Sequence, residues 1–294
     1  MVRTLKRSTF YTEKCDAAGL IPSCATFMRF VSFLDILGFA DIVESMPIQT
    51  VLRSLEVTLS MVPLVRSLGS VPGVAEPQFH IKAKESNVTI FSFSDTFVLA
   101  TRDDSPTSLF QIVAGTAIFS TYLFAAKLPV RGAITCGEAE YIHGTSHMVG
   151  RAIVRAARLE KCQEWFGVVI DPDILNAERL QILSIPLLKP LVVDYNVPLK
   201  PGAGIPNPCK VVNWRFNMVV QHGVSSLLRE GADPIHKTKR RHTLEFCRWL
   251  RTQGLAEGQI LSADGKDIGV PWLRGCWVAD KPPGTVGVGH GDEY

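Results

Sequence analysis

The chain has 294 residues, of which 46% are hydrophobic and 20% are charged, and its formal net charge is +3. This composition is typical of a packed globular protein and excludes a disordered chain, and so small a net charge gives no reason to expect binding to nucleic acid. Seven cysteines, an odd number without any C-x-x-C pair, favour a reduced, cytoplasmic protein. We expect no signal peptide, because the basic N-terminus lacks a long apolar run.

The first part of the chain alternates apolar runs with turn residues. Residues 1–26 show no sustained periodicity, and we expect an N-terminal arm that wraps the surface or is partly disordered. Apolar spacing predicts strands at 28–36, 78–84 and 88–101 and a helix at 48–68. Ser94 and Asp95 suit a tight turn, so we expect residues 88–101 to form a hairpin with Asp95 at its tip.

The second part of the chain continues this alternation of strands and helices. Ser105 and Pro106 resemble an N-cap and a first-turn proline, and predict a helix to about Lys127. Its least polar stretch, Gln111 to Ala126, is too short and too polar to span a bilayer, so we interpret it as a core helix. After it we expect strands at 129–136 and 167–171, a polar hairpin at 137–149, helices at 150–164 and 237–252, a loop at 201–208 and an irregular tail after Gly275. The whole pattern indicates an α/β (α+β) sandwich with a mixed sheet.

Two aspartates stand out because each lies in an apolar strand-and-turn setting. Asp35 lies in Phe33–Phe39, and Asp95 follows the apolar run that begins at Val88. A buried acid needs a partner, and a divalent cation is a common partner for two acids at once. After Asp35, Gly38 and the residues that follow suit a strand–turn–helix whose free N–H groups point at an anion. These features suggest metal-assisted chemistry on a nucleotide; the alternative is two ordinary capping or turn aspartates.

Two downstream motifs extend this pattern. Arg131–Gly137 looks like a strand of pattern R-x-x-I-x-x-G, and Gly150–Glu160 looks like a helix of pattern G-x-x-V-N-x-A-A-R-L. With the two aspartate motifs they resemble the class III nucleotidyl cyclases, over roughly residues 28–175, about half the chain. The sequence variants are most similar to the pyrimidine cyclases of the bacterial Pycsar anti-phage systems, which make cyclic UMP or cyclic CMP.

The resemblance implies a ferredoxin-like, palm-type mixed β-sheet with flanking helices. It places an N-terminal arm at 1–26, a cyclase domain at 27–190 and a C-terminal extension at 191–294 that packs on that domain. From the residues alone, the extension adds either packing or a dimer contact.

The same resemblance implies roles for individual residues. Asp35 and Asp95 would be the metal ligands, with the Ile36 carbonyl as a backbone ligand, for two Mg²⁺ or Mn²⁺ ions per active site. Leu37, Gly38 and Phe39 would cradle the β- and γ-phosphates. Arg158 would stabilise charge on the α-phosphate from across a homodimer interface. The alternative for Arg158 is a surface arginine paired with an acid such as Glu160.

The helix motif departs from the family at one position, where Val154 replaces an asparagine. Valine cannot donate a hydrogen bond. Arg151 and Arg155 lie on the same helical stripe as Arg158, so one of them could replace the missing donor, with Arg155 as the candidate catalytic residue. The alternative is a solvated basic face.

The base pocket departs as well. The positions that read the base in purine cyclases correspond to Phe91 and His147 here, which reproduce neither the adenine-reading nor the guanine-reading pair. Phe91 would pack against the ring and His147 would bond a base carbonyl; otherwise they are a core residue and a loop residue. Arg131 is either part of the site or structural. The basic run Lys237–Arg241 is either a phosphate patch or, more often for such runs, an exposed helix start.

The sequence therefore predicts a homodimeric, cytoplasmic lyase that converts UTP, or CTP, to the 3′,5′-cyclic monophosphate and pyrophosphate as an anti-phage signal. One alternative is a purine cyclase with an unusual pocket. Another is a non-catalytic cyclase-like module that binds nucleotide or only dimerises. The choice of base, the preferred metal, the activating trigger and the effector stay open at this stage.

Overall fold

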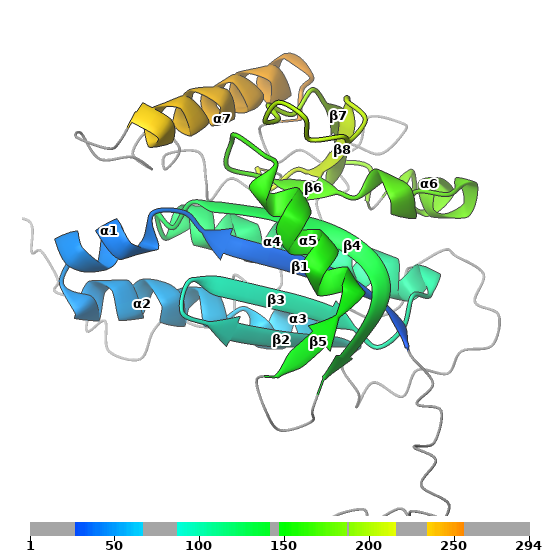
Figure 1. Cartoon of the computed structure of the whole chain (residues 1–294), viewed down its shortest axis with the longest axis horizontal. Helices are drawn as coiled ribbons and strands as arrows, with labels where there is room; N and C mark the ends of the chain where they lie inside the picture. Colours follow the sequence, from blue (N-terminus) through cyan, green and yellow to red (C-terminus); the bar gives the residue numbers. More distant parts are fainter. Residues whose placement is uncertain (1–26, 67–86, 142–146, 187, 216–233, 256–294) are drawn as a thin grey trace, which may run out of the picture.

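The computed structural model describes residues 27–66, 87–141, 147–186, 188–215 and 234–255. These residues form an α/β structure around an eight-stranded mixed sheet, in the order β2-β3-β1-β4-β6-β8-β7 with β5 paired to β4 (Figure 1). Its strands are β1 (Met28–Ile36), β2 (Val88–Phe93), β3 (Thr96–Thr101), β4 (Val130–Tyr141), β5 (Met148–Gly150), β6 (Val168–Ile170), β7 (Val192–Tyr195) and β8 (Cys209–Val212). The expected mixed-sheet α/β fold is confirmed.

Strand β1 lies at the centre of the sheet, antiparallel to β3 on one side and β4 on the other. Its alternating side chains face two different layers, as the period of a strand requires. In this register Asp35 lies directly opposite Thr96 on β3 and opposite Arg131 on β4. The three side chains therefore share one face of the sheet, at the end where β1 stops.

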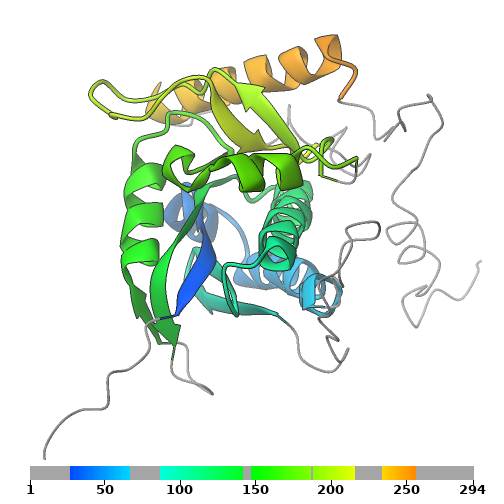
Figure 2. The same ribbon diagram turned by 90° about the vertical axis from the view of Figure 1, so that its right-hand side faces the viewer.

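Helix α4 (Pro106–Ala125) packs on the other face of the sheet and forms the main core with it (Figure 2). Ser105 caps it by accepting a hydrogen bond from the Ser108 N–H, as expected from the sequence. It is the one helix in the described ranges with the length and hydropathy of a membrane span, and nearly all of that span is buried in the fold. The expected core helix is confirmed. The short helices α1 (Phe39–Ser45), α2 (Ile48–Leu59) and α3 (Val62–Arg66) connect β1 to β2, and α2 and α3 contact α4.

Helix α5 (Arg151–Lys161) covers the opposite face, over β1 and β4 (Figure 2). Small residues allow this close approach: a Cβ placed on Gly137 would lie 3.5 Å from Ala152. The buried side of α5 consists of Ala152, Ala156, Leu159 and Glu160. Glu160 binds Arg131 of β4, and both side chains are almost fully buried. The ion pair thus fixes α5 to the strand that runs beside Asp35.

Strands β6, β8 and β7 continue the sheet beyond β4, so β7 and β8, from the expected C-terminal extension, hydrogen-bond into the same sheet. The chain passes from β6 to β7 through η1 (Pro172–Ile174) and α6 (Ala177–Leu183). Helix α7 (Pro234–Thr252) packs here: the Thr243 hydroxyl accepts from the Phe166 N–H at 2.8 Å, and the Phe246 ring packs edge-on to Trp165. The division at residue 190 stays a prediction.

Several expected elements differ in their bounds. The helix expected at 48–68 is two helices, because Pro63 has no N–H for the Leu59 carbonyl and its ring clashes there, so α2 ends at Leu59. The strand expected at 129–136 continues to Tyr141, since β5 supplies a pairing partner for its last residues. The arm 1–26, the strand 78–84 and the tail after Gly275 lie outside the described residues.

The buried Arg131–Glu160 pair gives a test of the fold. We expect Glu160→Gln to destabilise the protein by roughly 3–5 kcal/mol, because the buried Arg131 charge loses its partner. The double variant Arg131→Met/Glu160→Gln should lose less than the single variants Arg131→Met and Glu160→Gln combined, since it leaves no uncompensated buried charge. Urea unfolding of the four proteins measures this, and strictly additive losses would contradict the interpretation.

Candidate active site

The structure brings Asp35 and Asp95 together at one end of the sheet. Asp35 is next to the last residue of β1, and Asp95 lies in the two-residue turn between β2 and β3. The Ile36 N–H donates to the Asp95 carbonyl oxygen at 2.9 Å, which joins the two strand ends directly. The preceding Ser94 has a left-handed backbone (φ 54°), which makes the turn tight and fixes where Asp95 stands.

The two carboxyl groups are close enough to repel each other. Burial, followed by the negative charges of Glu160 and Asp95, raises the pKa of Asp35 to about 6. The Arg131 charge and a 3.4 Å hydrogen bond from the Thr96 hydroxyl act in the opposite direction without cancelling the shift. Negative charge therefore accumulates at the end of β1 beyond what the described neighbours neutralise.

This donor set fits a hard divalent cation that takes its remaining ligands from substrate and water. Mg²⁺ and Mn²⁺ are commonly held by one or two carboxylates plus substrate phosphates. In the ranges that the structure describes, no group of three or more His, Cys, Asp or Glu side chains could form an all-protein metal cage. The candidate ligands are Asp35 and Asp95, with Ile36 between them as the expected backbone ligand.

The turn after β1 offers fewer free N–H groups to an anion than the sequence suggested. The Leu37 N–H already donates to the Pro129 carbonyl at 2.8 Å, so this N–H is not available to a phosphate. Gly38 has a left-handed backbone (φ 70°), and no side chain caps the start of α1. Of the three residues expected to cradle phosphates, Gly38 and Phe39 therefore remain as candidates to donate an N–H to a phosphate.

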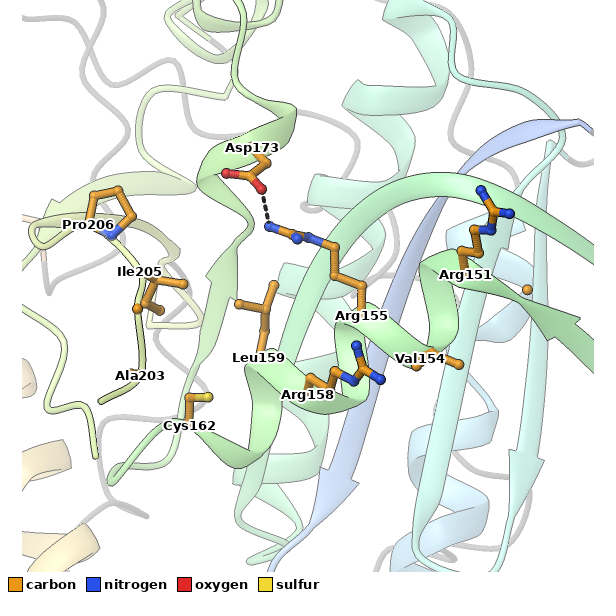
Figure 3. A pocket seen from close by; sticks show the side chains of 12 residues that line it. Arg151, Val154, Arg155, Arg158, Leu159, Cys162, Asp173, Ala203, Ile205 and Pro206 are labelled. Atoms are coloured by element: carbon orange, nitrogen blue, oxygen red, sulfur yellow. Dashed lines mark hydrogen bonds and ion pairs between the residues drawn. The ribbon is translucent and has the colours of Figure 1, made fainter. Parts of the chain in front are cut away.

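The outer face of α5 forms one wall of a groove of about 840 Å³ (Figure 3). The other wall is the loop Ala203–Pro206. Arg158 lies on this face, exposed, and makes no ion pair with any residue in the described ranges. Glu160, the acid that the alternative reading paired with it, binds Arg131 instead. The guanidinium of Arg158 is thus available to a ligand or to a second copy of the chain.

Arg155, in contrast, is held within its own chain. Its guanidinium forms an ion pair with Asp173 (Figure 3). It also forms an ion pair with Asp171, and Nη2 donates to Asp171 Oδ1 at 2.7 Å. The hydrogen bond to Asp171 and the charges of both aspartates raise the pKa of Arg155. A catalytic role for Arg155 stays a prediction, but the geometry favours a structural one. Arg151 pairs with Glu138 at 3.3 Å and is otherwise solvated.

The two expected base-reading residues lie on the α5 side of the sheet. Phe91 is half-buried, with its ring centroid 5.5 Å from that of Tyr141, and it packs in a small cluster that includes Met148 and Ile153. His147 is exposed and directly precedes Met148. The structure thus places Phe91 in this cluster and His147 next to one of its members in the sequence, and their role in base recognition stays a prediction.

Sequence reasoning did not identify Thr96, Glu160, Asp171 or Asp173 as members of the site environment. Thr96 and Glu160 act on the Asp35 carboxyl, and the two aspartates hold Arg155. The one sequence signal for Glu160 was its position on the apolar stripe of the helix expected at 150–164, where an acid needs a buried partner. Asp171 was interpreted only as the end of a strand.

Comparison with protein-family models finds no match to this chain, and neither does comparison with curated proteins.

Because the pKa of Asp35 is raised, removing its charge should stabilise the folded protein by an amount that depends on pH. Between about pH 4 and pH 6 the carboxyl ionises in the unfolded chain while it stays protonated in the folded one, so its stability penalty grows with pH. Asp35→Asn should therefore stabilise the metal-free protein more at pH 7.5 than at pH 5, by about 1 kcal/mol after allowance for partial solvent exposure. Denaturant unfolding at both pH values measures this.

The matched control is Glu44→Gln, at an exposed carboxyl of α1. A gain from Asp35→Asn that is equal at the two pH values, or that Glu44→Gln reproduces, would contradict the electrostatic account.

Proposed function

We propose that this protein is a class III-type nucleotidyl cyclase that converts a pyrimidine nucleoside triphosphate, UTP before CTP, to its 3′,5′-cyclic monophosphate. The observation that carries the proposal is the pair of acids at adjacent strand ends, whose mutual repulsion calls for a cation. The motif resemblance supplies the reaction class, and the setting in anti-phage signalling in the cytoplasm rests on that resemblance alone.

The arrangement of elements supports the finer fold. The two acids, the R-x-x-I-x-x-G strand β4 and the arginine-bearing helix α5 lie around one face of a mixed sheet. The motif resemblance implies this arrangement for a palm-type cyclase domain. The ion pair between Arg131 and Glu160 ties the strand motif to the helix motif, which explains why both occur in one chain.

In the proposed reaction the ribose 3′-hydroxyl loses its proton to solvent and its oxygen attacks the α-phosphorus, while the bond to the bridging oxygen breaks and pyrophosphate leaves with its electron pair. Asp35 and Asp95, with the Ile36 carbonyl, would hold two Mg²⁺ or Mn²⁺ ions, which supply a lower pKa for the attacking hydroxyl and neutralise the triphosphate. The chain's own task is to align these carboxylates, and bound cations would favour the ionised form of Asp35 against its raised pKa. Arg158 stabilises the charge that develops on the α-phosphate, an effect that grows toward the transition state.

The shared-site homodimer is supported by what α5 exposes. Val154 occupies the family's asparagine position with 51% of its surface exposed, beside the exposed Arg158. Phe93 at the β2–β3 turn is 80% exposed, close in sequence to Asp95. These two side chains are candidate contacts of the dimer interface that the motif resemblance implies. In a twofold dimer each copy would supply the acids of one site and the arginine of the other.

The pyrimidine preference rests on Phe91 and His147, because neither supplies the polar pairs that read purine edges. A half-buried phenyl ring offers a stacking or packing surface, and an imidazole can bond a base carbonyl.

The first test is incubation of the purified protein with each of the four nucleoside triphosphates and Mn²⁺ or Mg²⁺. We expect cyclic UMP or cyclic CMP, and a loss of at least about a thousandfold in Asp35→Asn and Asp95→Asn, since each removes a metal ligand. Cyclic purine products would favour the purine-cyclase alternative. Metal-dependent nucleotide binding without any product would favour the non-catalytic alternative and reject the proposal.

The second test addresses the shared site. Asp35→Asn and Arg158→Ala should each be inactive alone, because each destroys both sites of its homodimer. After mixing and subunit exchange, about a quarter of the sites should combine an intact Asp35 with an intact Arg158, so activity should return to that level. If the mixture regains no activity although tagged subunits show that exchange occurred, the shared site is rejected. Arg158 then acts either in the same chain's site as Asp35 or outside the active site.

A further inference from the structure

The beginning of helix α7 lies against the turn that follows β1. A Cβ placed on Gly38 would lie 3.0 Å from Cε1 and 3.5 Å from Nδ1 of His236, although the two residues are far apart in the sequence. Figure 1 shows the first turns of α7, in yellow, beside the end of β1 and the start of α1. Gly38 stands three residues after Asp35, so this helix adjoins the candidate active site.

Contacts in the middle of α7 hold it in this position. His242 Nδ1 lies 2.7 Å from the Glu164 carbonyl oxygen, and Thr243 bonds the backbone of Phe166. Phe246 and Leu250 are fully buried in the main core. The first turns of α7 are thus fixed by packing further along the helix.

Lys239, one turn after His236, is half-buried among other cations. Arg131 and Lys200 are close enough to repel it, and burial together with these two charges lowers its pKa. The acids near it are Glu160 and Glu164, and Glu160 is already bound to Arg131. Within the described ranges Lys239 forms no ion pair. Such a group favours an anion that the described residues do not supply.

The ion pair of Arg131 and Glu160 acts electrostatically on both Asp35 and Lys239. Lys239 and the acidic end of β1 therefore both lie near the same buried pair, and His236 lies near Gly38. A triphosphate whose α-phosphate is held at Asp35 and Asp95 has its β- and γ-phosphates free to extend past Gly38 toward this cationic end of α7.

We propose that His236 and Lys239 of α7 bind the terminal phosphates of the nucleoside triphosphate, so that the C-terminal extension completes the active site. This inference rests on the proposed function of the Asp35 and Asp95 site. Within the basic run Lys237–Arg241, Lys237 and Arg241 are exposed, as expected of a solvated helix start, whereas Lys239 and Arg240 are half-buried. The chemical class of the ligand is a linear polyphosphate with several negative charges.

The experiment measures binding of tripolyphosphate, in the presence of Mg²⁺, to the full chain by isothermal titration calorimetry. Lys239→Met should weaken binding at least tenfold and His236→Gln several-fold, whereas the exposed Lys237→Met should stay within twofold of the parent protein. Lys239→Arg, which keeps the charge, should bind more tightly than Lys239→Met. Parent-like affinity in Lys239→Met would overturn the inference.

Melting temperatures separate binding from folding. If Lys239→Met lowers both the melting temperature and the affinity, the comparison moves to Lys239→Arg and to His236→Gln at a temperature where each is folded. Equal losses in Lys239→Arg and Lys239→Met, or parent-like binding in His236→Gln, would then overturn the inference.

The same variants separate this inference from the proposed function. A cyclic product that forms with parent-like kcat and KM for UTP in Lys239→Met would reject the role of α7 alone. If the parent protein makes no cyclic product, and Lys239→Met still weakens polyphosphate binding, the cyclase proposal is rejected and the α7 site stands.

Discussion

The register of β1 between β3 and β4 is the constraint on which the site depends. It sets Asp35 opposite Thr96 and Arg131, and it brings the Asp95 turn within one hydrogen bond of Ile36. Because side chains alternate along a strand, a slip of one residue would turn Asp35 into the α4 core. The apolar residues of β1 on the α4 side, such as Phe30 and Leu34, prevent that slip because they are fully buried. The hydrophobic core thus positions an acid that it does not contact.

The Arg131–Glu160 pair connects the two halves of the proposed chemistry. It lies beside Asp35 through Arg131 and belongs to α5 through Glu160, and α5 carries Arg158 on its outer face. In the proposed twofold dimer, each copy would contribute Arg158 to its partner's active site. The Arg131–Glu160 pair of a copy would then connect that copy's own metal site to the Arg158 that it contributes. A pair this deeply buried favours one arrangement of strand and helix, because any shift exposes an unmatched charge to the interior.

Local signals in the sequence predicted much of the fold and the two acids of the site. The Ser94–Asp95 turn and the Ser105–Pro106 helix start are encoded within a few residues, and each was identified from them. The split of the helix at Pro63 was missed because apolar spacing continues across it. The partners Glu160 of Arg131 and Asp171 of Arg155 could not be predicted, since no local pattern pairs charges on different elements. The position of α7 against Gly38 is likewise set by packing of Phe246 and Leu250, which spacing alone does not orient.

The charge distribution is the strongest physical argument that this surface has a ligand. Two carboxyl groups repel each other at the end of β1, while Arg131 and Lys200 repel Lys239 near the same Arg131–Glu160 pair. Neither cluster benefits the folded chain by itself, because like charges at partly buried positions reduce stability. A metal-bound triphosphate would relieve both at once, since its cations would meet the acids and its terminal phosphates would meet the lysine. One ligand would therefore account for two separate unfavourable features, and an isolated metal ion or an isolated anion would account for only one of them.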